Sequence, residues 1–205
     1  MKTIACALLV SLGVACSDGG GSADDDDDAP AADADPNAPD APALSGPNVV
    51  LVTSMGTMVV RLAEDEMPIT TGNFLDYVDS GFYDDTLVHR VIDDWVIQGG
   101  GFASGMVPKS TNPPIVLETS PNIGHVHGAI SMARTTDPNS ATSQWFIVDW
   151  PESGTPPQPA QLDGQYAAFG LLIEGFDVLE TIATVETSSS DVPVTEVVVI
   201  SASRQ

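Results

Sequence analysis

Short apolar runs separated by turn-forming residues fill the chain from about residue 46 to its end. The run VVLVTSMGTMVVRL predicts two strands joined by a tight turn near Met55 and Gly56. Further runs are VIDDWVIQ, PPIVLE, GAISMA, SQWFIVDW and AAFGLLIE, and VTEVVVIS near the C-terminus predicts a closing strand. Many short strands at this spacing favour an all-β barrel or sandwich.

Two stretches have the features of helices instead. Residues 68–80 begin with a proline, carry apolar residues on one side and end before Gly81. Residues 175–183 place an apolar residue at every third position. No internal repeat of about 20 to 50 residues is visible, which argues against a solenoid.

Residues 82–102, FYDDTLVHRVIDDWVIQGGGF, hold the most informative pattern of the chain. Side chains alternate between two faces in an extended segment, so Arg90 and Gln98 would share a face with apolar neighbours. A turn at Asp93 and Asp94 would fold the segment into a hairpin. The glycines that follow would let another part of the chain approach closely. The pattern indicates a site without a nucleophile.

The charge of the chain argues against one class of partner. Its 205 residues carry a formal charge of -23 with only six Lys and Arg, whereas the phosphates of nucleic acids need cations to neutralise them. Much of the acid lies in residues 16–46, which are rich in Asp, Ala, Pro and Gly. Self-repulsion and the lack of apolar side chains predict that this segment is a disordered tether.

The N-terminus has the pattern of a secretion signal. A lysine precedes a short apolar run at residues 4–14, and small residues lead to Cys16. LGVAC followed by serine resembles a bacterial lipoprotein signal, which implies that residues 1–15 are removed and that Cys16 is lipidated. Ordinary signal cleavage is the alternative, because Gly13 departs from the lipoprotein pattern. After cleavage before Cys16, residues 47–205 would form one domain without a disulfide, stabilised by packing alone.

Four segments of this domain carry a family resemblance. FLDYVDSGFYDDTLVHRVIDDWVIQGGGF, GAISMAR, SATSQWFIV and LDGQYAAFG follow one another in this order. In order and approximate spacing they resemble the signature segments of the cyclophilin family of peptidyl-prolyl cis/trans isomerases. The resemblance implies a mainly β fold, a closed eight-stranded antiparallel β-barrel capped by two α-helices, with the substrate groove on the outside of the barrel.

The reaction of this family needs no covalent step. Rotation about an Xaa-Pro bond faces a barrier of about 18–20 kcal/mol, because the amide C–N bond has partial double-bond character. A catalyst must bind the twisted amide more tightly than either planar form. The prolyl nitrogen of the twisted amide has a localised lone pair, which the fixed donors of a guanidinium suit. We therefore expect Arg90 to donate to the prolyl nitrogen, with no cofactor and no metal.

The resemblance also implies the other residues of the site. Gln98 and Phe146 join Arg90 as catalytic residues, with Gln98 fixing the carbonyl side of the rotating bond and Phe146 forming part of an apolar wall. The implied substrate-binding residues are Trp95, Val96, Ala133, Arg134, Gln144, Leu162 and Tyr166.

Several positions depart from the family pattern. Trp95 stands where phenylalanine is usual and Val96 where methionine is usual, while Arg134 takes a place that is often asparagine and Tyr166 one that is often histidine. We expect activity to survive with altered substrate preference, and Arg134 could favour acidic substrates. Residues 151–161 look like a lengthened, proline-rich loop that could touch substrates or be a rigid surface turn.

Other interpretations have weaker support. His125 and His127 in GHVHG would share a strand face and could bind a metal, but the spacing shows no third ligand, so a structural role is favoured. His89 is expected to be buried and hydrogen bonded. Ser140 and Ser143 lack the nucleophile-elbow motif of a hydrolase. The main alternative to an enzyme is a proline-binding chaperone or interaction module that uses the same groove with little turnover.

The sequence therefore predicts a secreted prolyl isomerase that assists the folding of extracytoplasmic proteins. A lipid on Cys16 would hold it at a membrane, in the periplasm or at the cell surface. Its partners would be proline-containing polypeptides, and we expect a monomer.

Overall fold

The computed structural model describes residues 44–150 and 162–205 of the chain. The predicted signal, the lipidation at Cys16, the tether up to residue 43 and the predicted loop at residues 151–161 lie outside the described residues. Within the described part of the chain, every helix is too short or too polar to cross a bilayer.

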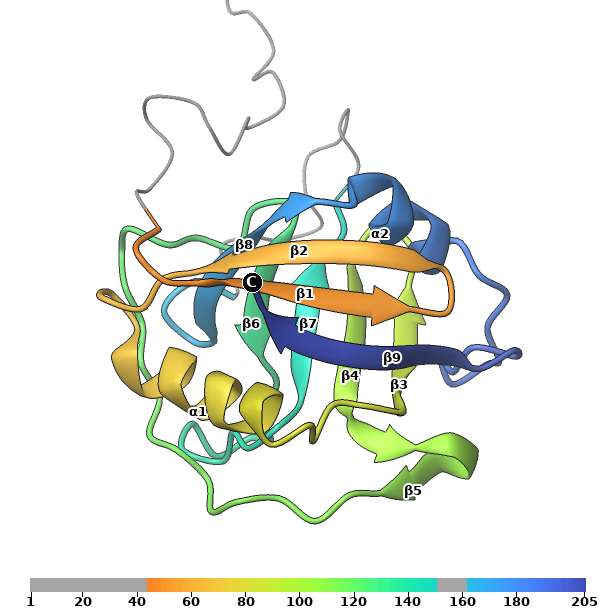
Figure 1. Cartoon of the computed structure of the whole chain (residues 1–205), viewed down its shortest axis with the longest axis horizontal. Coiled ribbons are helices and arrows are strands. Elements are labelled where there is room, and N and C mark those ends of the chain that lie inside the picture. Colours follow the sequence, from red (N-terminus) through yellow and green to blue (C-terminus); the bar gives the residue numbers. More distant parts are fainter. Residues whose placement is uncertain (1–43, 151–161) are drawn as a thin grey trace, which may run out of the picture. The chain divides into compact units, whose positions relative to one another are not determined.

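Antiparallel strands close into a barrel, as predicted (Figure 1). Eight strands follow the order β3-β9-β1-β2-β8-β6-β7-β4, and a pairing between β3 and β4 joins the two ends of this sheet. The short strand β5 pairs with the end of β4. The strands are β1 (Asn48–Thr53), β2 (Gly56–Leu62), β3 (Thr86–Ile92), β4 (Val96–Ala103), β5 (Val107–Pro108), β6 (Ala129–Met132), β7 (Trp145–Val148), β8 (Ala167–Glu174) and β9 (Val197–Arg204).

Both predicted hairpins are confirmed by the strand pairing. β1 pairs with β2 up to Thr53 and Gly56, and β3 pairs with β4 up to Ile92 and Val96. In the second hairpin Arg90 lies opposite Gln98. Directly opposed residues of an antiparallel pair project from the same face, so the two polar side chains are neighbours on one side of the sheet.

The prediction of a strand at PPIVLE is wrong. In this segment only Ile115 pairs with another part of the chain, through an isolated bridge to Ala141. Pro113 and Pro114 precede it, and a proline has no N–H to donate to a ladder. An apolar run alone was therefore not enough to form a strand here.

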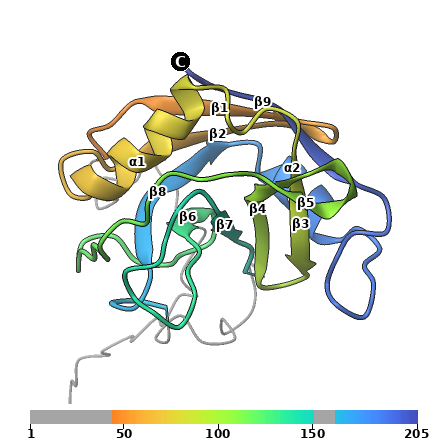
Figure 2. The same ribbon diagram turned by 90° about the horizontal axis from the view of Figure 1, so that it is seen from below.

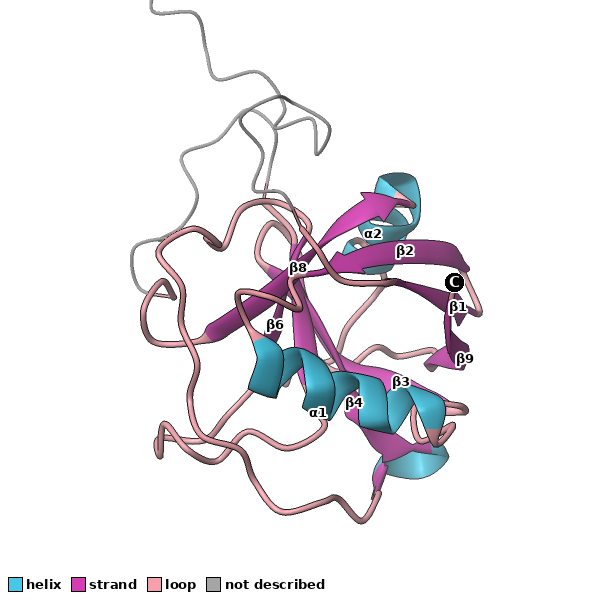
Figure 3. Cartoon of the chain, turned by 60° about the vertical axis from the view of Figure 1, so that its left-hand side comes forward, coloured by secondary structure: helices cyan, strands magenta, loops and turns pink. Residues whose placement is uncertain are grey.

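The two predicted helices are confirmed and lie on opposite sides of the barrel (Figures 1 and 2). Figure 3 shows helix α1 (Pro68–Asp79) lying across the strands, with α2 (Phe176–Ala183) at the far side. Each helix turns apolar side chains into the core, Phe74 and Val78 from α1 and Leu179 and Ile182 from α2.

Buried apolar residues form two clusters on the two faces of the same strands. In β7, Trp145 and Ile147 belong to the interior core of the barrel, whereas Phe146 and Val148 face outward. The alternation of side chains along a strand explains why all four residues are apolar. The outward-facing cluster, called the outer cluster below, consists of Val96, Ala129, Phe146, Val148, Trp150 and Leu171.

The glycine run of β4 makes room for two side chains next to it. A Cβ on Gly100, which has a φ of 81°, would lie 2.8 Å from the indole of Trp145. A Cβ on Gly101 would lie 2.6 Å from the Cγ and Nε2 atoms of Gln144. Real Cβ atoms essentially never come that close, so Gly100 makes room for the indole of Trp145 and Gly101 allows Gln144 to lie over β4, beside Gln98.

Candidate active site

A cavity of about 270 Å³ lies over the outer cluster. The side chains around it come from β3, β4, β7 and the segments after β6 and before β8. All of the predicted catalytic and substrate-binding residues line this cavity except Gln144, which contacts Gln98 from one side. The lining residues are Arg90, Trp95, Val96, Gln98, Ala133, Arg134, Phe146, Leu162 and Tyr166.

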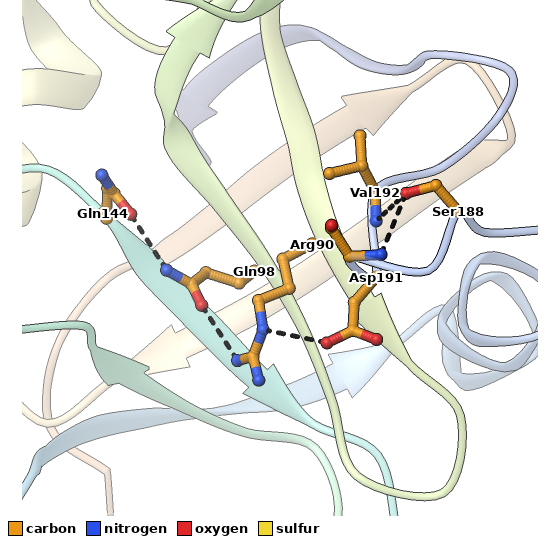
Figure 4. A network of polar contacts seen from close by, with 7 residues as sticks. Arg90, Gln98, Gln144, Ser188, Asp191 and Val192 are labelled. Atoms are coloured by element: carbon orange, nitrogen blue, oxygen red, sulfur yellow. Dashed lines mark hydrogen bonds and ion pairs between the residues drawn. The ribbon is translucent and has the colours of Figure 1, made fainter.

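One side of the cavity is a row of linked polar side chains (Figure 4). The Nη1 of Arg90 donates to the Oε1 of Gln98 over 3.4 Å, and the Nε2 of Gln98 donates to the Oε1 of Gln144 over 2.9 Å. The Nε of Arg90 faces the Oδ2 of Asp191 at 3.7 Å. We call these four residues the polar row. It fixes the carbonyl and amide ends of Gln98, because each end has its own partner.

Asp191 is a neighbour of the site that the sequence did not predict. It lies in the loop before β9, far along the chain from Arg90. An aspartate before Val-Pro is typical of a turn, and nothing in its spacing indicates which strand the turn packs against. The pairing of β3 with β9, which joins segments far apart in the sequence, brings this loop to Arg90.

An apolar wall adjoins the polar row, because Phe146 on β7 is the register partner of Gln98 on β4. Phe146 is 6% exposed, and Tyr166 meets its ring edge-on with centroids 5.8 Å apart. The imidazole of His125 stacks against Phe146 at 5.9 Å. Val96 belongs to the outer cluster, and Leu162 packs against that cluster. Phe146 is thus held by neighbours on several sides.

Trp95 lies at the rim of the wall. Trp95 is the last residue of the β3–β4 turn. It is 40% exposed, and it also lines the cavity. The carbonyl of Trp95 accepts a hydrogen bond from Asp149 N–H over 2.7 Å, which fixes the backbone of the turn. An exposed indole beside an apolar pocket adds a surface on which a peptide can pack.

Arg134 is held against the other rim. Its Nε donates to the carbonyl of Gln165 and its Nη1 to that of Thr135, over 2.9 and 2.8 Å. The guanidinium also lies over the ring of Tyr166, 4.4 Å from the centroid. Two backbone bonds and a cation–π contact restrict the side chain, so its charge stays close to the cavity.

His125 has a structural role, which the sequence favoured, but it does not lie on a strand. Its Nδ1 contacts the Oδ1 of Asp163 at 2.7 Å, and its Nε2 contacts the Oγ of Ser131 at 3.0 Å. Burial lowers the pKa of His125, and Asp163 opposes this effect. Ser131 is fully buried, so these three residues cannot act as a hydrolytic triad. They connect the segment of Leu162 to the strand beside Phe146.

His127 lies apart from His125, in a group with Asp149 and Glu180 whose possible ligand atoms are within 4.8 Å of one another. The N–H of Trp150 donates to the Nδ1 of His127 over 3.0 Å, so the neutral ring carries its proton on Nε2, which faces Glu180 at 3.9 Å. A metal-binding histidine has the reverse arrangement, because its second nitrogen donates. This geometry disfavours a metal at His127.

The carboxyl group of Asp149 holds a proton more tightly than an ordinary aspartate does. Burial raises the pKa of its carboxyl group to about 7, and the charge of Glu180 acts in the same direction. Close to neutral pH, a proton can therefore relieve the repulsion between the two carboxyl groups without a cation.

His89 is buried, as predicted, and burial lowers its pKa. The prediction that it is hydrogen bonded is not met at Nδ1, which has no partner among the described residues. The ring packs against Phe102 with centroids 4.7 Å apart. Polar contacts with the backbone of Leu87 and the side chain of Gln144 oppose the effect of burial on the pKa of His89.

Comparison with known proteins agrees with this fold. The family model for "Cyclophilin type peptidyl-prolyl cis-trans isomerase/CLD" matches residues 48–204. Peptidyl-prolyl cis-trans isomerase B of Escherichia coli is 40% identical over 157 residues, which cover 74% of this chain and 95% of that protein. A peptidyl-prolyl cis-trans isomerase of Streptomyces antibioticus is 45% identical over 159 residues, covering 75% of this chain and 96% of the relative.

A solved structure shows the same architecture. The crystal structure of a cyclophilin-type isomerase of Cryptosporidium parvum, in the presence of the dipeptide Ala-Pro, superimposes with a TM-score of 0.68 at 30% identity. The match covers 77% of this chain and 98% of that protein. The chain belongs to the cyclophilin family. It is a peptidyl-prolyl cis-trans isomerase.

Proposed function

We propose that Arg90 is the residue that promotes rotation of the prolyl bond, by donating a hydrogen bond to the prolyl nitrogen of the twisted amide. The supporting observation is the position of its guanidinium, which borders the same cavity as the apolar wall of Phe146, Val96 and Leu162. A proline ring held on that wall would turn its nitrogen toward a permanently charged donor. No nucleophile and no cofactor are required, because no bond is broken.

The contribution of Arg90 has a natural limit. A charge-assisted hydrogen bond is worth about 1.5–3 kcal/mol, which corresponds to roughly ten- to a hundredfold in rate. The remaining acceleration must come from removing water around the amide and from orienting its two ends. The buried ring of Phe146 serves the first purpose. Gln98, fixed by Gln144, can hold the carbonyl group on the rotating side.

The proposed substrates are proline-containing polypeptides. The relative from Cryptosporidium parvum was crystallised in the presence of Ala-Pro, a ligand that ends in proline. In this chain Ala133 and Arg134 lie at the edge of the cavity, where the residue before proline would bind. The restrained charge of Arg134 supports a preference for peptides with an acidic residue near the proline.

Exchange between cis and trans forms of an Ala-Pro peptide, measured by NMR with the full chain at substoichiometric concentration, tests the mechanism. We expect Arg90→Ala to lower kcat/KM about ten- to a hundredfold. Arg61→Ala is the matched control, because Arg61 lies on β2 and its side chain bonds only to Asn48 among the described residues. Equal activity of wild type and Arg90→Ala would refute the role of Arg90. Binding without exchange by wild type would instead support the interaction module.

We also propose that the enzyme acts outside the cytoplasm, held to a membrane by a lipid on Cys16. The support lies in the sequence pattern, a short apolar run that ends at Cys16 and an acidic stretch that separates it from the barrel. Incorporation of labelled fatty acid into the expressed chain, with mass measurement of the mature N-terminus, tests this. Cys16→Ser should abolish labelling and Cys6→Ser should not. Labelling that survives in Cys16→Ser would contradict the assignment, and a mature chain that starts with unmodified Cys16 would favour ordinary cleavage.

A further inference from the structure

The loop before β9 folds into a tight turn whose last residue is Asp191 (Figure 4). The N–H of Asp191 donates to the carbonyl of Ser188 over 3.0 Å, and the N–H of Ser188 donates to the carbonyl of Val192 over 2.8 Å. The Oγ of Ser188 also accepts a hydrogen bond from the N–H of Val192 over 3.4 Å. Asp191 has a φ of 61°, in the left-handed region. Aspartate, asparagine and glycine adopt this conformation more readily than other residues. The turn therefore sets the direction of the Asp191 side chain.

The same residue is attached to the strand that carries Arg90. The N–H of Val91, the residue next to Arg90, donates to the carbonyl of Asp191 over 2.8 Å. Asp191 thus contacts the backbone of Val91 and the side chain of Arg90, and these two contacts fix the loop against β3. The carboxylate reaches the Nε of Arg90 at 3.7 Å, with the two side chains 46% and 38% exposed.

The two contacts of Arg90 use different edges of its guanidinium. Nε faces Asp191, and Nη1 faces Gln98. The guanidinium is planar, so contacts at two of its nitrogens determine where the third one points. Neither contact uses Nη2. The polar row thus holds the group in one plane while it leaves a donor for a substrate.

We propose that Asp191 is a positioning residue for isomerisation, which orients the guanidinium of Arg90 toward the prolyl nitrogen. The proposal rests on the function of Arg90 proposed above. An exposed ion pair contributes about 0.2–1 kcal/mol. If the upper part of that range, about 0.4–1 kcal/mol, restricts Arg90 to its productive orientation, its loss lowers the rate about two- to fivefold. The effect falls on kcat, because Asp191 does not line the cavity in which the peptide binds.

A purely conformational role for Asp191 is the competing explanation, since its left-handed φ alone could account for an aspartate. Asp191→Asn separates the two explanations, because asparagine tolerates the same backbone and lacks the charge. Asp191→Gly also keeps the turn accessible but removes the whole side chain. Glu186→Gln is the matched control, because Glu186 is an exposed acid of the same loop with no side-chain contact to Arg90 among the described residues.

The experiment measures kcat and KM of the full chain by NMR exchange on an Ala-Pro peptide, for these variants alone and in an Arg90→Ala background. We expect Asp191→Asn and Asp191→Gly to lower kcat about two- to fivefold with KM and thermal unfolding unchanged. Glu186→Gln should match wild type. In the Arg90→Ala background Asp191→Asn should have no further effect, because the group it orients is absent. Raising the salt concentration should reduce the wild-type advantage over Asp191→Asn.

Wild-type or higher kcat in Asp191→Asn would overturn the proposal. So would a loss that persists in the Arg90→Ala background, because the effect would then not pass through Arg90. A wild-type rate for Arg90→Ala itself would remove the proposed role of Arg90, and with it the role of Asp191. Loss of activity in Arg90→Ala together with full activity in Asp191→Asn would leave the role of Arg90 intact and refute that of Asp191 alone.

Discussion

The two sides of the cavity are built in different ways. The apolar wall consists of side chains that are also part of the packing of the domain, with Val96 and Phe146 in the outer cluster. The polar row consists of partly exposed side chains, joined by contacts of 2.9, 3.4 and 3.7 Å. Buried packing carries most of the stability of a fold, whereas exposed polar contacts contribute little to it. The wall therefore cannot change without affecting stability, whereas the polar row can.

In the proposed mechanism, this difference separates binding from turnover. A wall that holds proline provides affinity for every Xaa-Pro bond, in the planar as well as the twisted state. A donor that meets the prolyl nitrogen chiefly when the amide is twisted provides rate. Val96 of the wall and Gln98 of the polar row lie on the same strand, β4, but the two proposed tasks fall to different side chains, so substitutions can address each task by itself.

The largest effect on stability is expected from a residue of β7 that faces the interior core. Trp145→Ala should lower the unfolding free energy by about 3–5 kcal/mol, because Trp145 is fully buried in the interior core. Phe146→Ala, one residue away, should cost less stability, because one side of the ring faces the cavity, and should lower kcat/KM at least about tenfold. Chemical denaturation and the exchange assay measure the two effects.

Ile200→Ala is the control for this pair, because Ile200 is 49% exposed on β9. It should change the unfolding free energy by less than about 0.5 kcal/mol. If Phe146→Ala destabilised the fold as much as Trp145→Ala and retained full activity, Phe146 would contribute only to packing and not to the site.

A second prediction concerns the buried carboxyl group at the end of β7. The pKa of Asp149 is raised to about 7 in the folded chain, so the folded state binds this proton more tightly than the unfolded state. Its contribution to stability is present below the ordinary carboxyl pKa and is lost as pH rises through the window from about 4 to about 7. Asp149→Asn should therefore be more stable than wild type by an amount that grows through this window, reaching the order of 1–4 kcal/mol.

Denaturation of both proteins at several pH values checks this sign. The difference in unfolding free energy should be small near pH 4 and constant above about pH 7. Glu180→Gln provides the control, because removing the neighbouring charge should lower the pKa of Asp149. The pH range over which stability changes should then become narrower. A difference that shrinks as pH rises would contradict the assignment.

The smallest effect is expected from a glycine that makes room for the polar row. In Gly101→Ala the new Cβ would lie 2.6 Å from Gln144 and displace it from Gln98. We expect kcat/KM to fall about two- to threefold, the loss of one partly exposed hydrogen bond, as in Gln144→Ala.

Gly72→Ala in helix α1 is the matched control, since its Cβ meets nothing within 4 Å. It should keep full activity and gain a few tenths of a kcal/mol up to about 1 kcal/mol in stability. Full activity in Gly101→Ala would show that the bond between Gln98 and Gln144 does not matter for turnover.

Local patterns were sufficient to predict the core of the site. Side-chain alternation on either side of a turn at Asp93 and Asp94 predicts that Arg90 and Gln98 share a face, and the register of β3 with β4 confirms it. The barrel topology and the other site residues came from family resemblance, because strand order depends on pairings between segments far apart in sequence. The strand expected at PPIVLE failed because its prolines cannot complete a ladder.

Contacts across the closed barrel could not be predicted. Asp191 reaches Arg90 only because β9 pairs with β3, and a sequence pattern carries no information on that register. The same is true of His125 and Asp163, which meet between two loops. The separation of His127 from His125 likewise follows from their loop, whereas the sequence suggested a shared strand face.

The separation of binding from turnover is tested most directly by one pair of measurements on Arg90→Ala. The dissociation constant of an Ala-Pro peptide and its exchange rate at saturating enzyme are measured for wild type and variant. The polar row predicts a dissociation constant within about threefold of wild type and an exchange rate lower by about ten- to a hundredfold. A loss of affinity that accounts for the whole loss of kcat/KM, with an unchanged rate at saturation, would show that Arg90 binds the substrate and does not promote its rotation.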